Sequence, residues 1–192
     1  IVSITAFGRI ERSKFNNISK VESGQKIYMS KSISLEGIMI IAKEKKEELK
    51  DVLSEDEMQK AENFYEELSI IKDAYVLRNN DISFLHDVTE GGILGAIYEM
   101  MRYCNKGCVI NYNDIKINNI TRKVCDHYNI DPTRLISSGC MLIITDDILE
   151  EEIDGVSFTQ IGVVTDDNMI FIRDGKTNDI TEPDSDAIYE VL

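Results

Sequence analysis

The pattern of apolar and polar positions along the chain predicts a mixture of strands and helices without strict alternation. Short apolar runs bounded by turn residues are typical of strands, whereas apolar residues three or four positions apart are typical of helices. The predicted strands cover residues 1–10, 25–30, 82–85, 108–112, 140–145, 158–164 and 169–172. The predicted helices cover residues 34–53, 54–78, 93–104, 119–128, 146–153 and 186–192, the second with a break near residue 69.

Local turn and capping signals refine the ends of several elements. Ser54 and Glu57 have the spacing of a capping box, which predicts a helix start at that point. Gly107 is a C-cap candidate for the helix that precedes it. The unbroken apolar run 140–145 predicts a strand buried on both faces. The polar residues 165–168 predict a hairpin between the two strands that flank them.

These elements together predict one α+β domain over residues 1–192. We expect a three-layer α/β/α arrangement with a mixed sheet of about six strands carrying helices. A chain of 192 residues can bury a substantial core, and no internal repeat or low-complexity linker divides it. No apolar run approaches the length of a membrane span, so we expect no membrane partner.

Charge and cysteine content narrow the expected partners and location. The net charge of −14 argues against a nucleic-acid partner, since phosphate backbones require clustered Lys and Arg. A polyphosphate ligand would need divalent cations or local donors to offset repulsion. Four cysteines without a Cys-x-x-Cys pair predict reduced thiols and a cytoplasmic protein. A zinc site is a weaker alternative, built from Cys104, Cys108, Cys125 and His127.

The candidate functional stretch is residues 86–92, between a predicted strand and a predicted helix. His86, Asp87 and Thr89 lie close together there and carry polar or titratable groups. Thr89 is an N-cap candidate, and Gly91 and Gly92 leave backbone N–H groups open at a helix N-terminus, where anions bind. The alternative is structural, because strand-to-helix turns often use Asp, Thr and Gly for geometry alone.

A second polar glycine turn precedes the predicted buried strand. It consists of Ser137, Ser138 and Gly139, and on its own this pattern is most often a simple turn. The chain has no Gly-x-Ser-x-Gly elbow, no Walker A loop and no Gly-x-Gly-x-x-Gly motif. Cys140 falls in the predicted central strand, which favours a place in the core over a nucleophilic role. Residues 86–92 and 137–139 are therefore the two candidate site segments.

Several segments, in order along the chain, resemble the C-terminal domain of the aminoimidazole ribonucleotide (AIR) synthase superfamily. The most specific is the sequence His-Asp-Val-Thr-Glu-Gly-Gly at residues 86–92, followed by Leu-Gly-Ala. The branch that the chain most resembles is that of AIR synthase-related proteins similar to HypE, a hydrogenase-maturation protein. The other segments that carry the resemblance are residues 5–9, 26–27, 33–42, 136–143 and 158–164.

The resemblance implies a two-domain, ATP-dependent enzyme of which this chain is the C-terminal domain. The N-terminal domain, expected upstream of residue 1, would bind most of the ATP and Mg²⁺ and would form a homodimer. The implied chemistry is activation of an amide or carbonyl oxygen by phosphoryl transfer. The implied substrate is a small molecule or a carbamoyl-type group, since HypE-like proteins dehydrate a carbamoyl thioester. The isolated domain is expected to be inactive.

The resemblance also implies roles for the two turns. Gly91 and Gly92 would hold phosphate charge through their N–H groups, with Ser137, Ser138 and Gly139 as further nucleotide-binding residues. In the candidate catalytic set, Asp87 would orient a donor or take a proton, His86 would form hydrogen bonds or carry a proton, and Thr89 would donate to a phosphate oxygen or cap the helix. No metal ligand is expected in this chain.

Two departures from the family pattern leave other functions open. Lys31 and Ser32 replace a glycine-bearing turn, and residues 189–192 lack the cysteine on which HypE carries its carbamoyl group. One alternative is a non-catalytic scaffold or partner-binding domain that keeps the fold. Another is a kinase similar to thiamine-monophosphate kinase, which shares the fold. The His-Asp-Val-Thr sequence favours the HypE-like branch over that kinase.

Overall fold

The computed structural model describes residues 3–5, 7–9 and 20–192, and the predicted strand 1–10 lies partly outside these ranges. Its described residues, 3–5 and 7–9, have no regular structure. The strands are β1 (Lys26–Ser30), β2 (Ile82–Val88), β3 (Gly107–Asn111), β4 (Cys140–Thr145), β5 (Glu152–Ile153), β6 (Val156–Thr165), β7 (Met169–Arg173) and β8 (Lys176–Asp179). The α-helices are α1 (Leu35–Glu44), α2 (Glu55–Glu62), α3 (Ile71–Val76), α4 (Gly92–Cys104) and α5 (Asn119–Tyr128). Short 3₁₀ helices are η3 (Glu48–Asp51), η4 (Phe64–Glu67), η5 (Tyr112–Asp114), η6 (Pro132–Arg134) and η7 (Ala187–Glu190).

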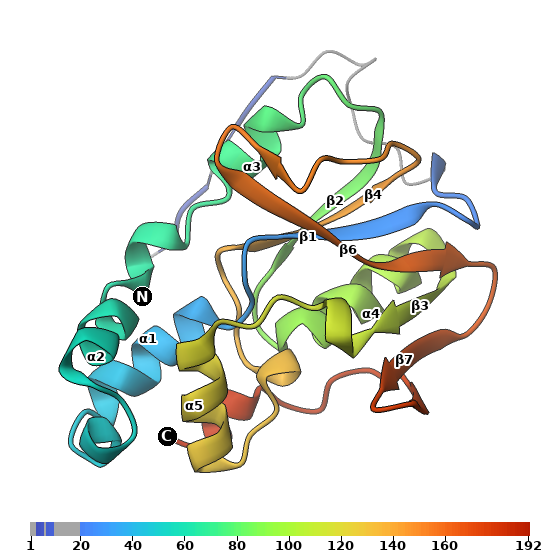
Figure 1. Cartoon of the computed structure of the whole chain (residues 1–192). Helices are drawn as coiled ribbons and strands as arrows, with labels where there is room; N and C mark the ends of the chain where they lie inside the picture. Colours follow the sequence, from blue (N-terminus) through green and yellow to red (C-terminus); the bar gives the residue numbers. More distant parts are fainter. Residues whose placement is uncertain (1–2, 6, 10–19) are drawn as a thin grey trace.

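A mixed sheet forms the centre of the fold and confirms the predicted α+β class (Figure 1). Its strand order is β2-β4-β1-β6-β3-β7-β8, with β5 paired to β6 outside this path. The sheet has eight strands, more than the six expected from the sequence. Within it β3 and β7 are parallel, and the other pairs are antiparallel. The apolar strand β4 is buried along its whole length, as predicted, because its side chains alternate between the hydrophobic clusters on the two faces of the sheet.

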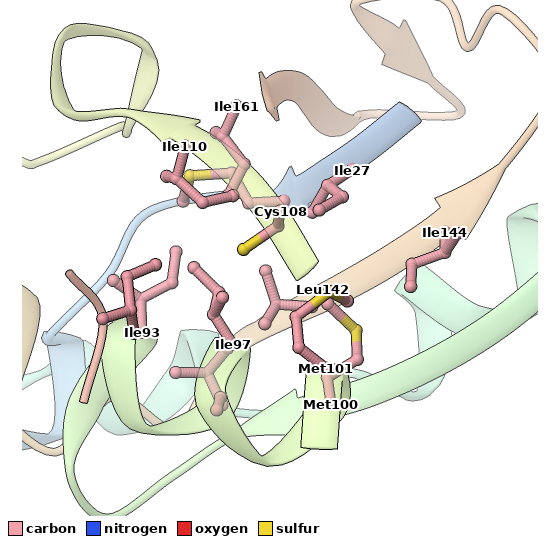
Figure 2. Packing of buried hydrophobic residues seen from close by; sticks show 14 of the residues in the cluster. Ile27, Ile93, Ile97, Met100, Met101, Cys108, Ile110, Leu142, Ile144 and Ile161 are labelled. Carbon is pink, nitrogen blue, oxygen red and sulfur yellow. The ribbon is translucent and has the colours of Figure 1, made fainter. Parts of the chain in front are cut away.

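The helices cover both faces of the sheet and one of its ends. Helix α4 lies on one face, where its apolar side chains form one buried cluster with those of β1, β2, β3, β4, β6 and β7 (part of it in Figure 2). On the other face, side chains near α3 pack against β1, β4 and β6 in a smaller cluster. A third cluster joins α1, α2 and α5 at one end of the sheet (Figure 1). None of the described helices is long and apolar enough to cross a membrane.

The predicted hairpin of β6 and β7 is wrong, because β3 lies between these two strands. It pairs antiparallel with β6 (Val109 opposite Val163) and parallel with β7 (Val109 opposite Ile170). The connection between β6 and β7 passes over the start of β3, where a Cβ on Gly107 would lie 2.2 Å from the Asp167 carbonyl oxygen. The absence of a side chain at Gly107 therefore permits this close approach. The C-cap of α4 is Asn105, in a left-handed conformation, and not Gly107.

Three predicted helices are also corrected. The first ends at Glu44 and gives way to η3, and the stretch 54–78 is divided into α2, η4 and α3. Residues 146–153 contain β5 and no helix, and the side chains of the first two residues bond to neighbouring segments. Asp146 accepts a hydrogen bond from Gln25, and Asp147 accepts one from Asn80. The capping box at the start of α2 is confirmed, with Ser54 and Glu57 bonded in both directions.

The cysteines behave as core residues. All four are free, and Cys108, Cys125 and Cys140 are buried. Burial raises the pKa of each of these three thiols to about 12, which keeps them protonated at neutral pH. Within the described residues no group of three or more His, Cys, Asp or Glu side chains is arranged to hold a metal ion.

Candidate functional site

The first candidate segment begins inside β2 and ends at the start of α4. His86, Asp87 and Val88 belong to the strand and pair with Leu142, Met141 and Cys140 of β4. Alternation along a strand sends the side chains of His86 and Asp87 to opposite faces of the sheet. Because β2 is an edge strand, both residues keep contact with solvent. The predicted turn is thus shorter than expected.

The His86 ring lies between two carboxylates. Its Nε2 is 3.2 Å from Oε2 of Glu99 on α4, and its Nδ1 is 3.4 Å from Oδ1 of Asp87. The His86 side chain is 20% exposed, whereas those of Asp87 and Glu99 are 60% and 57% exposed. This arrangement orients the imidazole and places proton acceptors at both of its nitrogens. Glu99 is not among the predicted site residues, although it lies on the helix that directly follows the motif.

The glycine pair at the start of α4 is required by the chain's own packing. Gly91 and Gly92 have φ of 79° and 65°, the left-handed region that disfavours other residues. A Cβ on Gly92 would lie 2.5 Å from the Thr133 carbonyl oxygen of η6. The absence of side chains therefore lets another backbone segment approach, and the N-cap of α4 is Gly91 rather than Thr89.

A carboxylate from the C-terminal segment occupies the start of α4. Asp186, only 3% exposed, accepts hydrogen bonds from the N–H groups of Gly91 (2.7 Å), Ile136 (3.1 Å) and Ile188 (2.9 Å). The N–H of Gly92 donates to the Thr89 carbonyl at 3.2 Å. An internal carboxylate therefore accepts the hydrogen bond of one of the two donors that the sequence assigns to an anion. Phosphate binding by these two donors stays a prediction, and it would require their present bonds to be exchanged.

The second candidate turn lies directly beside the first. The Ser137 N–H donates to the Thr89 carbonyl at 3.2 Å, and the buried Ser137 Oγ accepts from the Ser34 N–H at 2.5 Å. Gly139, with φ of 101°, faces the backbone of residues 67–68. Ser138 is half-buried and makes no side-chain hydrogen bond to the described residues. The structure therefore brings both predicted turns together, and Ser137 links them to the start of α1.

A buried network supports the same region from the other face of the sheet. The Lys31 ammonium donates to the carbonyls of Glu67 and Ser69, both at 2.9 Å, and lies 3.3 Å from the buried carboxylate of Asp73. Asp73 also accepts a hydrogen bond from the Ser30 hydroxyl at 2.6 Å. Lys31 thus holds the segment that Gly139 packs against.

Comparison with protein families identifies one match over most of the chain. Residues 22–175 match the model of the AIR synthase related protein, C-terminal domain. No curated protein sequence matches the chain.

Solved structures share the fold at low sequence identity. Escherichia coli HypE, a hydrogenase maturation protein, is 16% identical with a TM-score of 0.72, over 92% of this chain and 55% of that one. HypE in complex with ATP is 14% identical with a TM-score of 0.69, over 96% and 58%. Thiamine monophosphate kinase from Aquifex aeolicus is 15% identical with a TM-score of 0.59, over 82% and 52%. The chain therefore spans little more than half the length of these structures.

Proposed function

Because the chain belongs to the AIR synthase-related proteins and carries their C-terminal domain, we propose that it acts within an ATP-dependent enzyme. That enzyme activates an amide or carbonyl oxygen by phosphoryl transfer. The observation that carries the proposal is the convergence of the two polar turns at one edge of the sheet. The hydrogen bond from Ser137 to Thr89 joins these turns beside His86 and its two carboxylates.

In this proposal the exposed residues of the first turn face the substrate. Asp87 and His86 hold or move a proton, since both nitrogens of the ring lie next to carboxylate oxygens. Thr89 is exposed, and its hydroxyl donates a hydrogen bond to a phosphate oxygen. Gly91, Gly92 and the turn of Ser138 and Gly139 form the wall behind them.

ATP and Mg²⁺ require more than the described residues of this chain supply. These residues contain no cluster of three metal-binding side chains, and Asp186 engages the Gly91 donor. The proposal therefore assigns most nucleotide and metal contacts to an upstream domain. Support comes from the similar structure of HypE that was solved with ATP. The chemistry supplied by ATP is transfer of its terminal phosphoryl group.

The substrate, assembly and location follow from the HypE-like branch. We propose a carbamoyl-type or other amide substrate, a role close to hydrogenase maturation, a homodimer of the full-length protein and a cytoplasmic location. The hydrogenase-maturation proteins among the similar structures support this assignment.

Substitution of Asp87 tests the proposal in the protein with its upstream domain. Asp87→Ala should lower ATP turnover by about 100-fold, the usual contribution of a positioned proton-transfer group. Asp166→Ala is the matched control, since Asp166 is a similarly exposed carboxylate in a surface pair with Lys106. Unchanged turnover in Asp87→Ala, measured by phosphate release, would contradict the assigned role.

A second candidate function is a non-catalytic scaffold that retains the fold. The observation in its favour is the Asp186 carboxylate, which already satisfies the donors at the start of α4. Isothermal titration with ATP and Mg²⁺ distinguishes the two functions. Binding with micromolar to millimolar affinity supports the enzyme, and no binding by the protein with its upstream domain supports the scaffold.

A further inference from the structure

Glu36 carries a buried carboxylate oxygen without a hydrogen-bond partner. It lies in the first turn of α1, and its Oε2 is shielded from solvent although the residue as a whole is partly exposed. None of the ion pairs or side-chain hydrogen bonds among the described residues includes Glu36. A buried acceptor without a donor costs free energy, so such groups in native proteins usually serve a bound water, an ion or a ligand.

The environment of Glu36 differs from that of two comparable groups. Glu57, in the first turn of α2, bonds to the Ser54 N–H and to Lys123, so its carboxylate is satisfied. Thr121 also has an unpartnered buried oxygen, but its side chain is neutral and wholly enclosed. Glu36 alone of the three combines a charge, an unpartnered buried oxygen and a residue that is otherwise partly exposed.

Glu36 lies next to the two turns of the candidate site. Hydrogen bonds on both sides tie its helical turn to the second turn, one from Ser34 N–H to Ser137 Oγ (2.5 Å) and one from Gly37 N–H to the Ile136 carbonyl (3.2 Å). Ser137 in turn bonds to Thr89 of the first turn. The three segments therefore meet at the first turn of α1, which contains Glu36.

The side of α1 that bears Glu36 faces η4. Glu36 and Lys43 are seven residues apart and so share one side of the helix. The Lys43 ammonium lies 5.6 Å from the ring centroid of Tyr65 in η4. The end of η4 also approaches Gly139, whose Cβ would lie 3.0 Å from the Glu67 carbonyl oxygen. The helical turn that contains Glu36 thus lies near both η4 and the second turn.

We propose that the Glu36 carboxylate binds the N–H group of a primary amide or carbamoyl substrate. An ionised carboxylate only accepts hydrogen bonds, so its partner must be a donor. The described residues form no metal cluster around it, which disfavours a divalent cation. The inference rests on the proposed function, in which the oxygen of an amide is activated. When the amide N–H donates a hydrogen bond to a carboxylate, electron density shifts from the amide nitrogen toward the amide oxygen. The amide oxygen then becomes a better nucleophile.

The first test measures stability and does not depend on ATP. Glu36→Met removes the unpartnered oxygen while keeping the length of the side chain, so the melting temperature should rise by about 2–4 °C. Glu57→Gln is the matched control and should lower it, because Glu57 is satisfied. A lower melting temperature for Glu36→Met would overturn the proposal, since it would show that Glu36 stabilises the fold.

The second test measures binding by nuclear magnetic resonance, with propionamide as the probe. Propionamide should shift the backbone amide signals of Gly37 and Ser138 in a saturable manner. N,N-dimethylpropionamide, which has the carbonyl but no N–H, should not shift them. Glu36→Gln should weaken the propionamide response at least tenfold. No response, an equal response to both amides, or an unchanged response in Glu36→Gln would each overturn the proposal.

Titration of ATP and Mg²⁺ into the protein with its upstream domain separates the two hypotheses. Propionamide binding without ATP binding would leave the Glu36 site standing and refute phosphoryl transfer. ATP binding without propionamide binding would refute the Glu36 site alone.

Discussion

Helices α2 and α4 begin in contrasting ways. The start of α2 is satisfied by neighbours in sequence, with Ser54 and Glu57 bonded to each other in a capping box. The start of α4 is satisfied by Asp186, which lies 95 residues from Gly91. Both helices solve the same problem, which is the set of unpaired N–H groups at a helix N-terminus. The local solution can be removed without disturbing other segments, whereas the distant one joins α4, residue 136 and the C-terminal segment.

Removal of the distant cap should have the largest effect. Asp186→Ala leaves the buried N–H groups of Gly91, Ile136 and Ile188 without an acceptor, and we expect a loss of about 4 kcal/mol in the free energy of unfolding. Urea denaturation followed by circular dichroism measures this loss. Asp186→Asn keeps one carbonyl oxygen as an acceptor, so its free energy of unfolding should fall by less. Equal stability of Asp186→Ala and the wild type would show that the contact is dispensable.

Substitution of Gly92, the glycine next to that cap, should have the second-largest effect. Gly92→Ala puts a Cβ on a residue with left-handed backbone, 2.5 Å from the Thr133 carbonyl oxygen. We therefore expect the free energy of unfolding to fall by about 3 kcal/mol. Gly24→Ala is the control, since Gly24 also has a positive φ but its Cβ would meet nothing within 4 Å. In that control the free energy of unfolding should fall by only about 1 kcal/mol, because of backbone strain alone. Similar losses in both variants, measured by the same denaturation, would argue against the close approach of η6.

Removal of the local cap should have a smaller effect. Ser54→Ala deletes the acceptor for the Glu57 N–H, and the expected loss is about 1 kcal/mol. Thermal unfolding measures it, with Ser69→Ala, outside any helix, as the control. A loss as large as that of Asp186→Ala would remove the contrast between the two helix starts.

The smallest effect concerns pH and the same local cap. The hydrogen bond from Lys123, together with the Ser54 N–H, holds the pKa of Glu57 below its ordinary value of 4.5. The resulting stabilisation is complete above that value and is lost as the pH falls through the folded-state pKa. Glu57→Gln should therefore remove a small part of the acid dependence of stability between neutral pH and pH 3. An unchanged pH profile of unfolding in Glu57→Gln would contradict this assignment.

The candidate site shows the same division between local and distant contacts. His86 and Asp87 were identified from a short motif, and their polar atoms approach at the open edge of β2 although alternation directs the two side chains to opposite faces. Glu99, Asp186 and Glu36 were not identified as site residues. Their part in it depends on the packing of α4, the C-terminal segment and α1 against the two turns.

The sequence by itself determined the elements that local chemistry controls. Among these are the buried strand β4, helix α5, the capping box of α2 and the family to which the chain belongs. Only the tertiary structure decided that β3 separates β6 from β7 and that Asp186 fills the start of α4. The physical reason is range. Propensity, capping and turn geometry act over a few residues, whereas strand order and the partners of buried polar groups depend on which distant segments pack together.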